Sequence, residues 1–430
     1  MLPTSCSRVE QLSSSQPRRS RSMHSATLTS LEADLSEIGA LAFFKHASSK
    51  HMCSYITGFG ETVVSIGRYK QYLVGNGLVT LDPLQADRYD PTLVKDLSGE
   101  HLLIAAIPFD PQVAFQVTVP EVAVVFAQKG GVSISMPQDD HTQALDILQK
   151  LVHGTARNTI SNAPQLRGVV IYAETKVEFE NRVNHAIQAI KNTSLSKVVL
   201  SQSALISYSE RPNPQFLFDK LVEDRPATYL FSLGNYLGAS PELVVNLKGS
   251  SLISHPLAGT AQSATMDSLL LSDKDNREHN IVVRQINARL LELGISSQHQ
   301  SKPTIASYGE IVHLGSRISG QLSLTSPLTS IEIAAHLAPT AAVNGEPYGD
   351  AMSYILSNEA PSRGLYGGLV GYQKMGGDGS WILNIRSIEL EDYRAILRAG
   401  VGIVDGSNPS TEYFEATSKI DVVASSILDP

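Results

Sequence analysis

The sequence predicts an α+β fold of layered type, with mainly antiparallel sheets and helices packed outside them. Strand-like and helical segments alternate without a regular strand–helix–strand rhythm, and later strand pairs are joined by short Gly/Asp-rich turns. The 430 residues, 42% hydrophobic, can form one large core. No linker rich in Pro, Gly or Ser divides the chain after Ser30, so we expect a single large domain.

The composition excludes several classes of protein. The net charge is −8, and no Lys/Arg-rich stripe with interleaved aromatic residues is present, so we expect no nucleic-acid partner. Every apolar run is far shorter than the roughly 20 residues of a membrane helix, so we expect no membrane partner. Cys6 and Cys53 cannot build a disulfide framework, which favours a reducing, cytoplasmic location.

Residues 1–29 are Ser-rich and contain four arginines, one acidic residue and no apolar core of a secretory signal. They are either a disordered leader or an organelle transit segment, and Met23 is an alternative start. The expected folded domain is 30–430.

The first helix is expected from Ser30, a capping residue before Leu31, Leu35, Ile38 and Leu41. Alternation and helical periodicity then define the elements up to the middle of the chain. These are strands within 54–73, 102–109, 122–128 and 132–136, helices over 139–152 and 177–191, and strands over 198–206, 229–233, 243–247 and 252–256.

A long helix is expected over 270–293, stopped by Gly294, and shorter helices over 328–337 and 349–358. Strands over 365–374, 380–390 and 393–404 then suggest an antiparallel meander. Asn408 and Pro409 open the last helix.

The long helix carries a carboxylate on its apolar face. Glu278 precedes Val282 by four residues and Ile286 by eight, and Asp275 lies one turn earlier on the same face. A buried carboxylate needs a partner. Either Arg277 or a distant lysine pairs with Glu278, or the first turn extends past the core, or the face forms a site.

The last helix places Glu412, Glu415 and Lys419 on one face. Such an i,i+4 pair is commonly an exposed helix stabiliser. Alternatively, the carboxylates of two helices could together bind Mg²⁺. This ion takes oxygen ligands and completes its shell with water and substrate.

Other candidates are weaker singly. The segments 255–260 and 398–403 are expected to be Gly-rich turns whose backbone amides could approach an anion. Arg386, expected inside a strand, could hold a carboxylate or face solvent. His313 is either a core histidine or part of a site.

Taken in order, these segments resemble the chorismate-utilising enzymes: the isochorismate, salicylate, anthranilate and aminodeoxychorismate synthases. The resemblance runs from about residue 181 to 427, the motif-bearing catalytic part, whereas 30–180 form the N-terminal part. It rests on KVVLS at 197–201, GASPEL at 238–243, PLAGT at 256–260, DKDNREH at 273–279, HLG at 313–315, RGLYGG at 363–368, IRS at 385–387, AGVGI at 399–403 and the glutamates at 412 and 415.

Within the family, the segments 106–111, 339–345 and 378–381 resemble isochorismate synthases of the siderophore-pathway type. Salicylate synthases carry Thr where this chain has Ala342. Anthranilate-type enzymes usually lack an equivalent of Lys197 and use an amidotransferase, for which this chain has no segment. Val401, Gln202 and Asn344 depart from the usual pattern.

The resemblance implies an anthranilate synthase component I-like fold and a Mg²⁺-dependent, reversible conversion of chorismate to isochorismate. Water would add at C2 of the ring while the C4 hydroxyl departs. The alternatives are a salicylate synthase, an ammonia-dependent anthranilate-type subunit and a non-catalytic chorismate-binding relative. We expect chorismate as the small-molecule partner, no amidotransferase subunit, and a monomer or weak homodimer. Three downstream pathways begin at isochorismate, and the sequence does not choose among them: those to a catecholate siderophore, to salicylate and to menaquinone.

The resemblance also assigns roles to residues. Lys197 would be the general base and Glu242 the general acid, with a raised pKa. Glu278 and Glu415 would bind Mg²⁺, with Asp275 and Glu412 in or near the second shell. The substrate-binding residues would be Gly259 and Thr260 at the ring carboxylate, Tyr366, Arg386 and Gly402 at the pyruvyl carboxylate, and His313 and Lys419 nearby.

Overall fold

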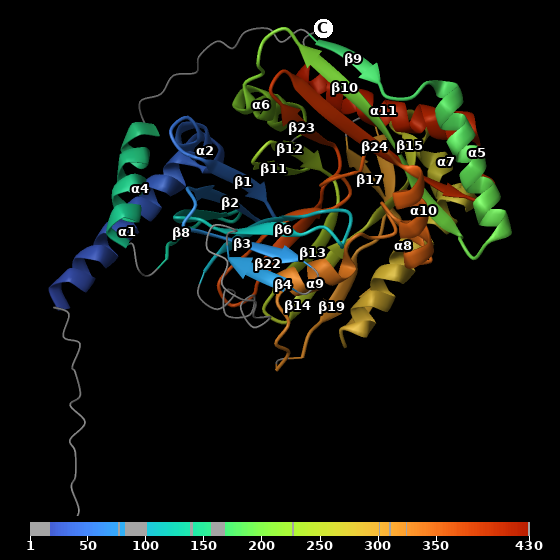
Figure 1. The fold of residues 1–430 in the computed structure, drawn as a ribbon. Helices are drawn as coiled ribbons and strands as arrows, with labels where there is room; N and C mark the ends of the chain where they lie inside the picture. Colours follow the sequence, from blue (N-terminus) through green and yellow to red (C-terminus); the bar gives the residue numbers. More distant parts are fainter. Residues whose placement is uncertain are drawn as a thin grey trace, which may run out of the picture.

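The computed structural model describes residues 18–75, 78–81, 101–137, 141–155, 168–225, 228–300, 302–308, 311–323 and 325–428. Two large sheets and one small sheet contain the described strands, and helices cover their outer faces (Figure 1). All of the strand pairs are antiparallel, as the sequence predicts.

The larger sheet contains β1 (Cys53–Thr57), β2 (Glu61–Ile66), β7 (Val122–Ala127), β8 (Val132–Ser135), β9 (Gly168–Tyr172), β10 (Lys197–Tyr208), β11 (Tyr229–Leu233), β12 (Tyr236–Ser240), β20 (Gly345–Glu346), β23 (Ser387–Glu391) and β24 (Arg394–Val404). Its order is β20-β10-β24-β23-β12-β11-β1-β2-β7-β8, with β9 paired to β10.

The second sheet contains β3 (Lys70–Gly75), β4 (Leu78–Leu81), β5 (Leu103–Ile107), β6 (Phe115–Val119), β13 (Leu243–Lys248), β14 (Ser251–His255), β16 (Ser296–His299), β19 (Ile318–Gln321), β21 (Leu369–Gln373) and β22 (Gly379–Leu383). Its order is β16-β19-β14-β13-β22-β21-β5-β6-β3-β4. The small sheet is β15 (Leu257–Gln262), β18 (Ile311–Gly315) and β17 (Thr304–Tyr308).

The helices are α1 (Arg18–Ile38), α2 (Ala40–Ser48), α4 (His141–Thr155), α5 (Lys176–Asn192), α6 (Pro214–Asp224), α7 (Met266–Leu271), α8 (Asp273–Glu292), α9 (Ser330–Leu337), α10 (Tyr348–Asn358) and α11 (Pro409–Ile427). Helices α1, α2 and α4 lie at one end of the molecule, and α5, α8 and α10 at the other (Figure 1). No helix among the described residues combines the length and apolar character that crossing a bilayer requires.

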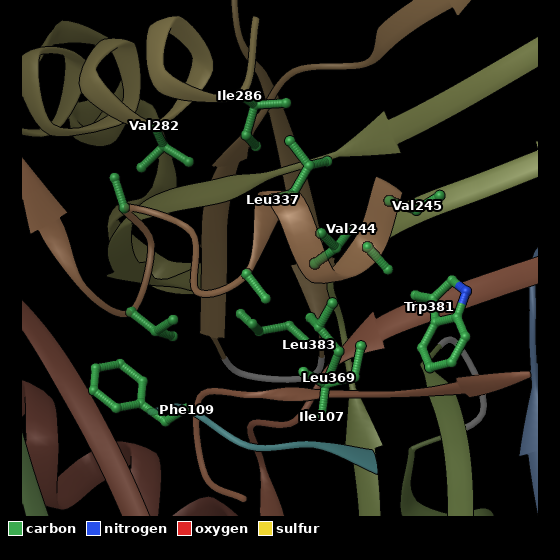
Figure 2. Packing of buried hydrophobic residues seen from close by; sticks show 14 of the residues in the cluster. Ile107, Phe109, Val244, Val245, Val282, Ile286, Leu337, Leu369, Trp381 and Leu383 are labelled. Atoms are coloured by element: carbon green, nitrogen blue, oxygen red, sulfur yellow. The ribbon is translucent and has the colours of Figure 1, made fainter. Parts of the chain in front are cut away.

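The main core lies between the second sheet and helices α8 and α9. Val282 and Ile286 of α8 lie towards Leu337 of α9, and α9 packs on β13 and β22, whose Val244 and Trp381 belong to the same core (Figure 2). All of these side chains are buried, as the period of the long helix predicts. The first turn of α8 carries the same face out of this core and towards β15.

Several expected elements are divided or displaced. The first helix begins at Arg18 rather than Ser30, within the expected leader, and ends before Gly39, whose φ of 78° favours glycine. Residues 1–17 lie outside the described part. The expected helix 270–293 is α7 and α8, separated by Ser272, whose hydroxyl accepts a bond from the Asp275 amide.

The expected strand 380–390 is wrong in a more informative way. It divides at residues 384–386 into β22 of the second sheet and β23 of the larger sheet, so the expected meander becomes two antiparallel pairs, β21–β22 and β23–β24, in different sheets. The Gly-rich segments 255–260 and 398–403 were expected to be turns. Instead they belong mostly to β15 and β24, because their glycines are tolerated where another chain segment packs closely.

Candidate active site

A cavity of about 590 Å³, including its open mouth, lies where the chain passes between the sheets. Glu242 follows β12 and precedes β13, and Arg386 lies between β22 and β23, so both stand at crossings from one large sheet to the other. The Leu383 amide donates to the Glu242 carbonyl at 3.0 Å, which joins the two crossings.

The structure brings the predicted residues together. Those that line the cavity are Glu242, Gly259, Thr260, Glu278, His313, Tyr366, Arg386, Gly402 and Lys419. The other four, Lys197, Asp275, Glu412 and Glu415, contact or electrostatically influence residues of this lining.

Lys197 begins β10, and its side chain is fully buried. Its Nζ lies 3.1 Å from Oε1 of Glu278, which projects from the first turns of α8. Glu278 is therefore buried with a distant lysine as its partner, whereas Arg277 donates to the Asp273 carbonyl. This ion pair joins the proposed base to a proposed metal ligand.

Glu242 lies in a different environment. Burial raises the pKa of its carboxyl group to about 8, although a bond from the Leu257 amide and the charge of Lys197 act in the opposite direction. Its Oε1 is buried and makes no hydrogen bond. At neutral pH the carboxyl group therefore keeps its proton, as a general acid requires.

The Glu415 side chain of α11 is 20% exposed and has cationic partners. Burial alone would raise the pKa of Glu415, but Lys419, Lys274 and the Thr260 hydroxyl hold it below its usual range. Lys419 Nζ lies 2.6 Å from Glu415 Oε1 and donates to the Gly400 carbonyl at 3.0 Å. This i,i+4 pair is thus part of the cavity and not an exposed helix stabiliser.

Glu412 is paired across the two helices. Its Oε1 accepts a bond of 2.5 Å from Lys274 of α8. Burial, followed by the charge of Glu415, raises the pKa of Glu412 to about 7, although Lys274 opposes this. Burial also raises the pKa of Asp275, with smaller contributions from Glu278 and Glu415. The carboxylates of α8 and α11 therefore act on one another electrostatically.

Two glycines make room for these side chains. A Cβ at Gly402 would lie 2.1 Å from Glu278 Oε1 and 2.9 Å from Lys197 Cε, so a larger residue there would displace these side chains. Gly259 has a φ of 77° at an irregularity in the β15–β18 pairing, and a Cβ there would meet Asp275 at 3.0 Å. Both close approaches are made by helix α8.

The opposite side of the cavity is cationic. Arg386 has a φ of 53°, in the left-handed region, and this conformation forms the passage from β22 to β23. Burial lowers the pKa of Arg386 to about 10, so it stays charged at neutral pH. Burial raises the pKa of Tyr366 to about 12, so its hydroxyl stays a donor. Arg386 is therefore only partly exposed and belongs to the lining of the cavity.

His313 is held as a neutral ring. Burial, followed by the charges of Arg386 and Lys419, lowers the pKa of His313 to about 3. Arg386 Nη2 lies 3.4 Å from His313 Nε2, and a guanidinium can only donate, so Nε2 accepts. Nδ1 then carries the proton and donates to the Gly259 carbonyl at 3.1 Å. His313 thus links the cationic side to β15.

The donor chemistry of the helix side fits a hard cation. No group of three or more His, Cys, Asp or Glu side chains among the described residues is arranged as a complete metal site. Mg²⁺, however, is often held by one or two carboxylates with water and substrate oxygens. Glu278 and Glu415 supply two carboxylates, and the buried Glu412 Oε2 has no hydrogen-bond partner.

Sequence reasoning missed two cations. Lys274 pairs with Glu412, and Arg363 forms a buried pair with Glu359 directly behind the cavity. Both stand inside motifs that carry the resemblance, at 273–279 and 363–368, which was the available signal. Their partners are distant or unmarked in the sequence, so no role could be assigned to them.

The fold and this cavity define an acid–base enzyme site for a small anionic molecule. The chain belongs to the chorismate-binding enzyme family, since the family described as "Chorismate binding enzyme" matches residues 107–428. The isochorismate synthase DhbC of Bacillus subtilis is 32% identical over 338 residues, which are 74% of this chain and 78% of that protein.

Solved structures agree on the fold. DhbC from Bacillus anthracis superposes with a TM-score of 0.71 at 25% identity, covering 89% of this chain and 98% of that one. Anthranilate synthase component I from Streptococcus pneumoniae also gives 0.71, at 22% identity, covering 85% and 92%. The predicted component I-like fold is thereby confirmed.

Proposed function

We propose that this protein is an isochorismate synthase, which isomerises chorismate to isochorismate. The observation that carries the proposal is the pair formed by Lys197 and Glu242 at one cavity. A fully buried lysine stands beside Glu278, and a carboxyl group that is protonated at neutral pH lines the same cavity. The similarity to the isochorismate synthase of Bacillus subtilis supports it.

The two groups divide the proton transfers. Lys197 is the proposed base that takes a proton from the water adding at C2 of the ring. Glu242 gives its proton to the C4 hydroxyl, which leaves as water while the double bonds rearrange. One water enters and one leaves, so the reaction is a balanced isomerisation, and its reverse uses the same groups in exchanged roles.

The substrate is a dicarboxylate, and the cavity offers places for both carboxylates. We propose that Arg386 and Tyr366 hold the pyruvyl carboxylate near Gly402, since a guanidinium is suited to a carboxylate. Gly259 and Thr260 of β15 would hold the ring carboxylate, next to Lys419 and His313. The neutral state of His313 leaves the charge on Arg386 available to the substrate.

Mg²⁺ is proposed as the cofactor. Glu278 and Glu415 would hold it, and Asp275 and Glu412 would orient this side of the site through their charges. When bound, the ion would neutralise the ring carboxylate and hold it in place. Lys274 keeps Glu412 fixed at the edge of this group.

A salicylate synthase would additionally eliminate pyruvate from isochorismate. Ala342 lines the cavity where the salicylate synthases carry Thr, and this favours the isomerase. We further propose that the enzyme works in the cytoplasm, in siderophore biosynthesis through salicylate or 2,3-dihydroxybenzoate. It would need no ammonia-supplying subunit.

The test is to incubate the purified protein with chorismate and Mg²⁺, without ammonia, and to separate the products by chromatography. A mixture of isochorismate and chorismate without pyruvate, lost with EDTA or in Lys197→Ala, is the expected result. Lys374→Ala is the matched control, because Lys374 pairs with Glu61 away from the cavity. Circular dichroism verifies that each variant is folded. Salicylate with equal pyruvate, or no turnover by the wild type, would contradict the proposal.

A further inference from the structure

A buried ion pair that the proposed chemistry does not use lies behind the cavity. Arg363 is 3% exposed, and its Nε donates to Glu359 Oε2 at 2.6 Å. Its Nη2 donates to Glu359 Oε1 at 2.7 Å, so the contact is bidentate. We call these two residues the clamp.

The remaining bonds of the clamp go to the wall of the cavity. Arg363 Nη1 donates to the Val343 carbonyl at 2.7 Å, and Nη2 also donates to the Val199 carbonyl at 2.8 Å. Both valines line the cavity. Glu359 accepts bonds from the Ser201 amide at 2.7 Å and the Ser201 hydroxyl at 2.9 Å. The clamp thus joins β10 to the segment 339–345.

A third part of the wall depends on the same residue. The Arg363 carbonyl accepts the Tyr366 amide at 3.0 Å, in the turn that presents Tyr366 to the cavity. The guanidinium lies 4.4 Å from the centre of the Phe109 ring, which faces the core at the end of β5 (Figure 2). One side chain therefore contacts or orients the segments that carry Val199, Val343 and Tyr366.

Stability alone does not account for this pair. Replacing a buried ion pair by packed apolar side chains often leaves stability unchanged or raises it. A lysine in place of Arg363 would keep the charge but could not present a rigid fork to four acceptors. What the arginine supplies is a fixed geometry between three chain segments.

We propose that Arg363 and Glu359 are positioning residues that set the shape of the cavity wall formed by Val199, Val343 and Tyr366. They thereby determine how tightly a ring dicarboxylate is held, without touching it. This inference rests on the proposed function for its substrate. The acid–base groups Lys197 and Glu242 do not belong to the clamp. We therefore expect them to keep their positions when the clamp is changed.

The experiment compares Arg363→Met, Glu359→Met and the double variant with the wild type. Glu359→Met leaves the buried Arg363 charge without its carboxylate, and Arg363→Met leaves Glu359 with the more distant Arg182, 3.4 Å from Oε1, as its cationic partner, so both variants should unfold at a lower temperature. The double variant should recover the unfolding temperature but not the function. We expect its KM for chorismate to rise about tenfold with kcat changed by less than about threefold, the pattern of lost uniform binding. Arg363→Lys should give an intermediate KM.

The matched control is Lys374→Met with Glu61→Gln. This pair, 2.7 Å apart, also joins distant segments, but neither residue lines the cavity, and Gln keeps an acceptor for the Tyr372 hydroxyl. Its KM should equal that of the wild type. A double clamp variant with recovered stability and wild-type KM would overturn the proposal.

A second measurement does not depend on turnover. Hydrogen exchange followed by mass spectrometry should show faster exchange in 197–203 and 339–345 of the double variant, because the Val199 amide donates to the Asn344 carbonyl at 2.8 Å across these segments. Unchanged exchange there would overturn the clamp. If the wild type fails to convert chorismate while the exchange rises as expected, the proposed function fails and the positioning role stands.

Discussion

Glu242 lines the cavity and Glu415 lies beside it, and the pKa values of these two carboxyl groups are shifted in opposite directions. Glu242 lies at a crossing between the sheets, and burial raises the pKa of its carboxyl group to about 8. Burial acts on Glu415 in the same direction, but the cations of α8 and α11 reverse it and lower the pKa of Glu415. The comparison shows that nearby cations, rather than burial, decide which carboxyl group gives a proton and which stays ionised.

The distribution of lysines explains the contrast. Lys419 lies one helical turn from Glu415, and Lys274 reaches α11 from α8. Glu242 stands where β12 ends and β13 begins, and the charge of Lys197 does not offset the effect of burial on its pKa. The helix side is thus suited to hold a cation, and the crossing is suited to hold a neutral acid.

Removing the proton of the neutral acid should have the largest effect. Glu242→Gln keeps the shape of the side chain but cannot give a proton, so kcat should fall by about 10²–10⁴, the usual contribution of a general acid. Product formation from chorismate measures it. The unfolding temperature should not fall, because Gln adds no buried charge. A variant with more than a tenth of wild-type kcat would show that Glu242 is not the acid.

Displacing Glu278, on the helix side of the cavity, should lower the activity by a similar or smaller factor. Gly402→Ala would place a methyl group 2.1 Å from Glu278 Oε1 and push it away from Lys197. A displacement of about 1 Å at a site can cost about 100-fold in activity. Gly349→Ala is the control, since nothing lies within 4 Å of its Cβ position. Equal activity of the two variants would contradict the geometry described for Glu278.

Neutralising the ionised glutamate should affect the cation more than the acid–base chemistry. Glu415→Gln removes a proposed ligand, so the Mg²⁺ concentration for half-maximal activity should rise by about tenfold or more. A Mg²⁺ titration of the initial rate measures the change. Exposed Glu292→Gln on α8 should leave the titration unchanged. An unchanged titration for Glu415→Gln would place the cation elsewhere.

The smallest effect concerns stability and pH. The folded-state pKa of Glu242 is raised from 4.5 to about 8, so the folded protein binds the proton more tightly than the unfolded chain. The stability from this group is complete below about pH 4.5 and is lost as the pH rises through about 8, by up to about 1.4 kcal/mol per pH unit. For Glu415 the sign is reversed, and stability is lost as the pH falls.

Glu242→Gln should therefore show a flatter decline of unfolding free energy between pH 5 and 8 than the wild type. Urea unfolding at several pH values measures the difference. The curves should converge below about pH 4.5, where the carboxyl group is neutral in both the folded and the unfolded state. Parallel curves over the whole range would contradict the raised pKa.

The sequence predicts the helix side of the site better than it predicts the crossings between the two large sheets. The period of α8 placed Glu278 on the face of Val282 and Ile286, and the period of α11 aligned Glu412, Glu415 and Lys419, because helix faces follow from local spacing. The partner of Glu278 was left open, since Lys197 lies on a strand about 80 residues earlier.

The crossings could not be predicted from local pattern. Residues 380–390 look like one strand, and only the pairing of β22 with β13 and of β23 with β12 shows that the chain changes sheets at Arg386. Such pairings depend on residues far apart in the sequence, and the φ of Arg386 follows from them. The roles of Glu242 and Arg386 came from the resemblance, and their environments from the fold.

The most direct test of the central contrast is infrared difference spectroscopy of the protein between pH 6 and pH 9, for the wild type and Glu242→Gln. The wild type should lose protonated carboxyl signal in two steps, one near pH 7 from Glu412 and one near pH 8 from Glu242, and only the step near pH 8 should be missing from the variant. A wild-type titration without the step near pH 8, or the same step in Glu242→Gln, would contradict the assignment of Glu242 as the neutral acid beside an ionised Glu415.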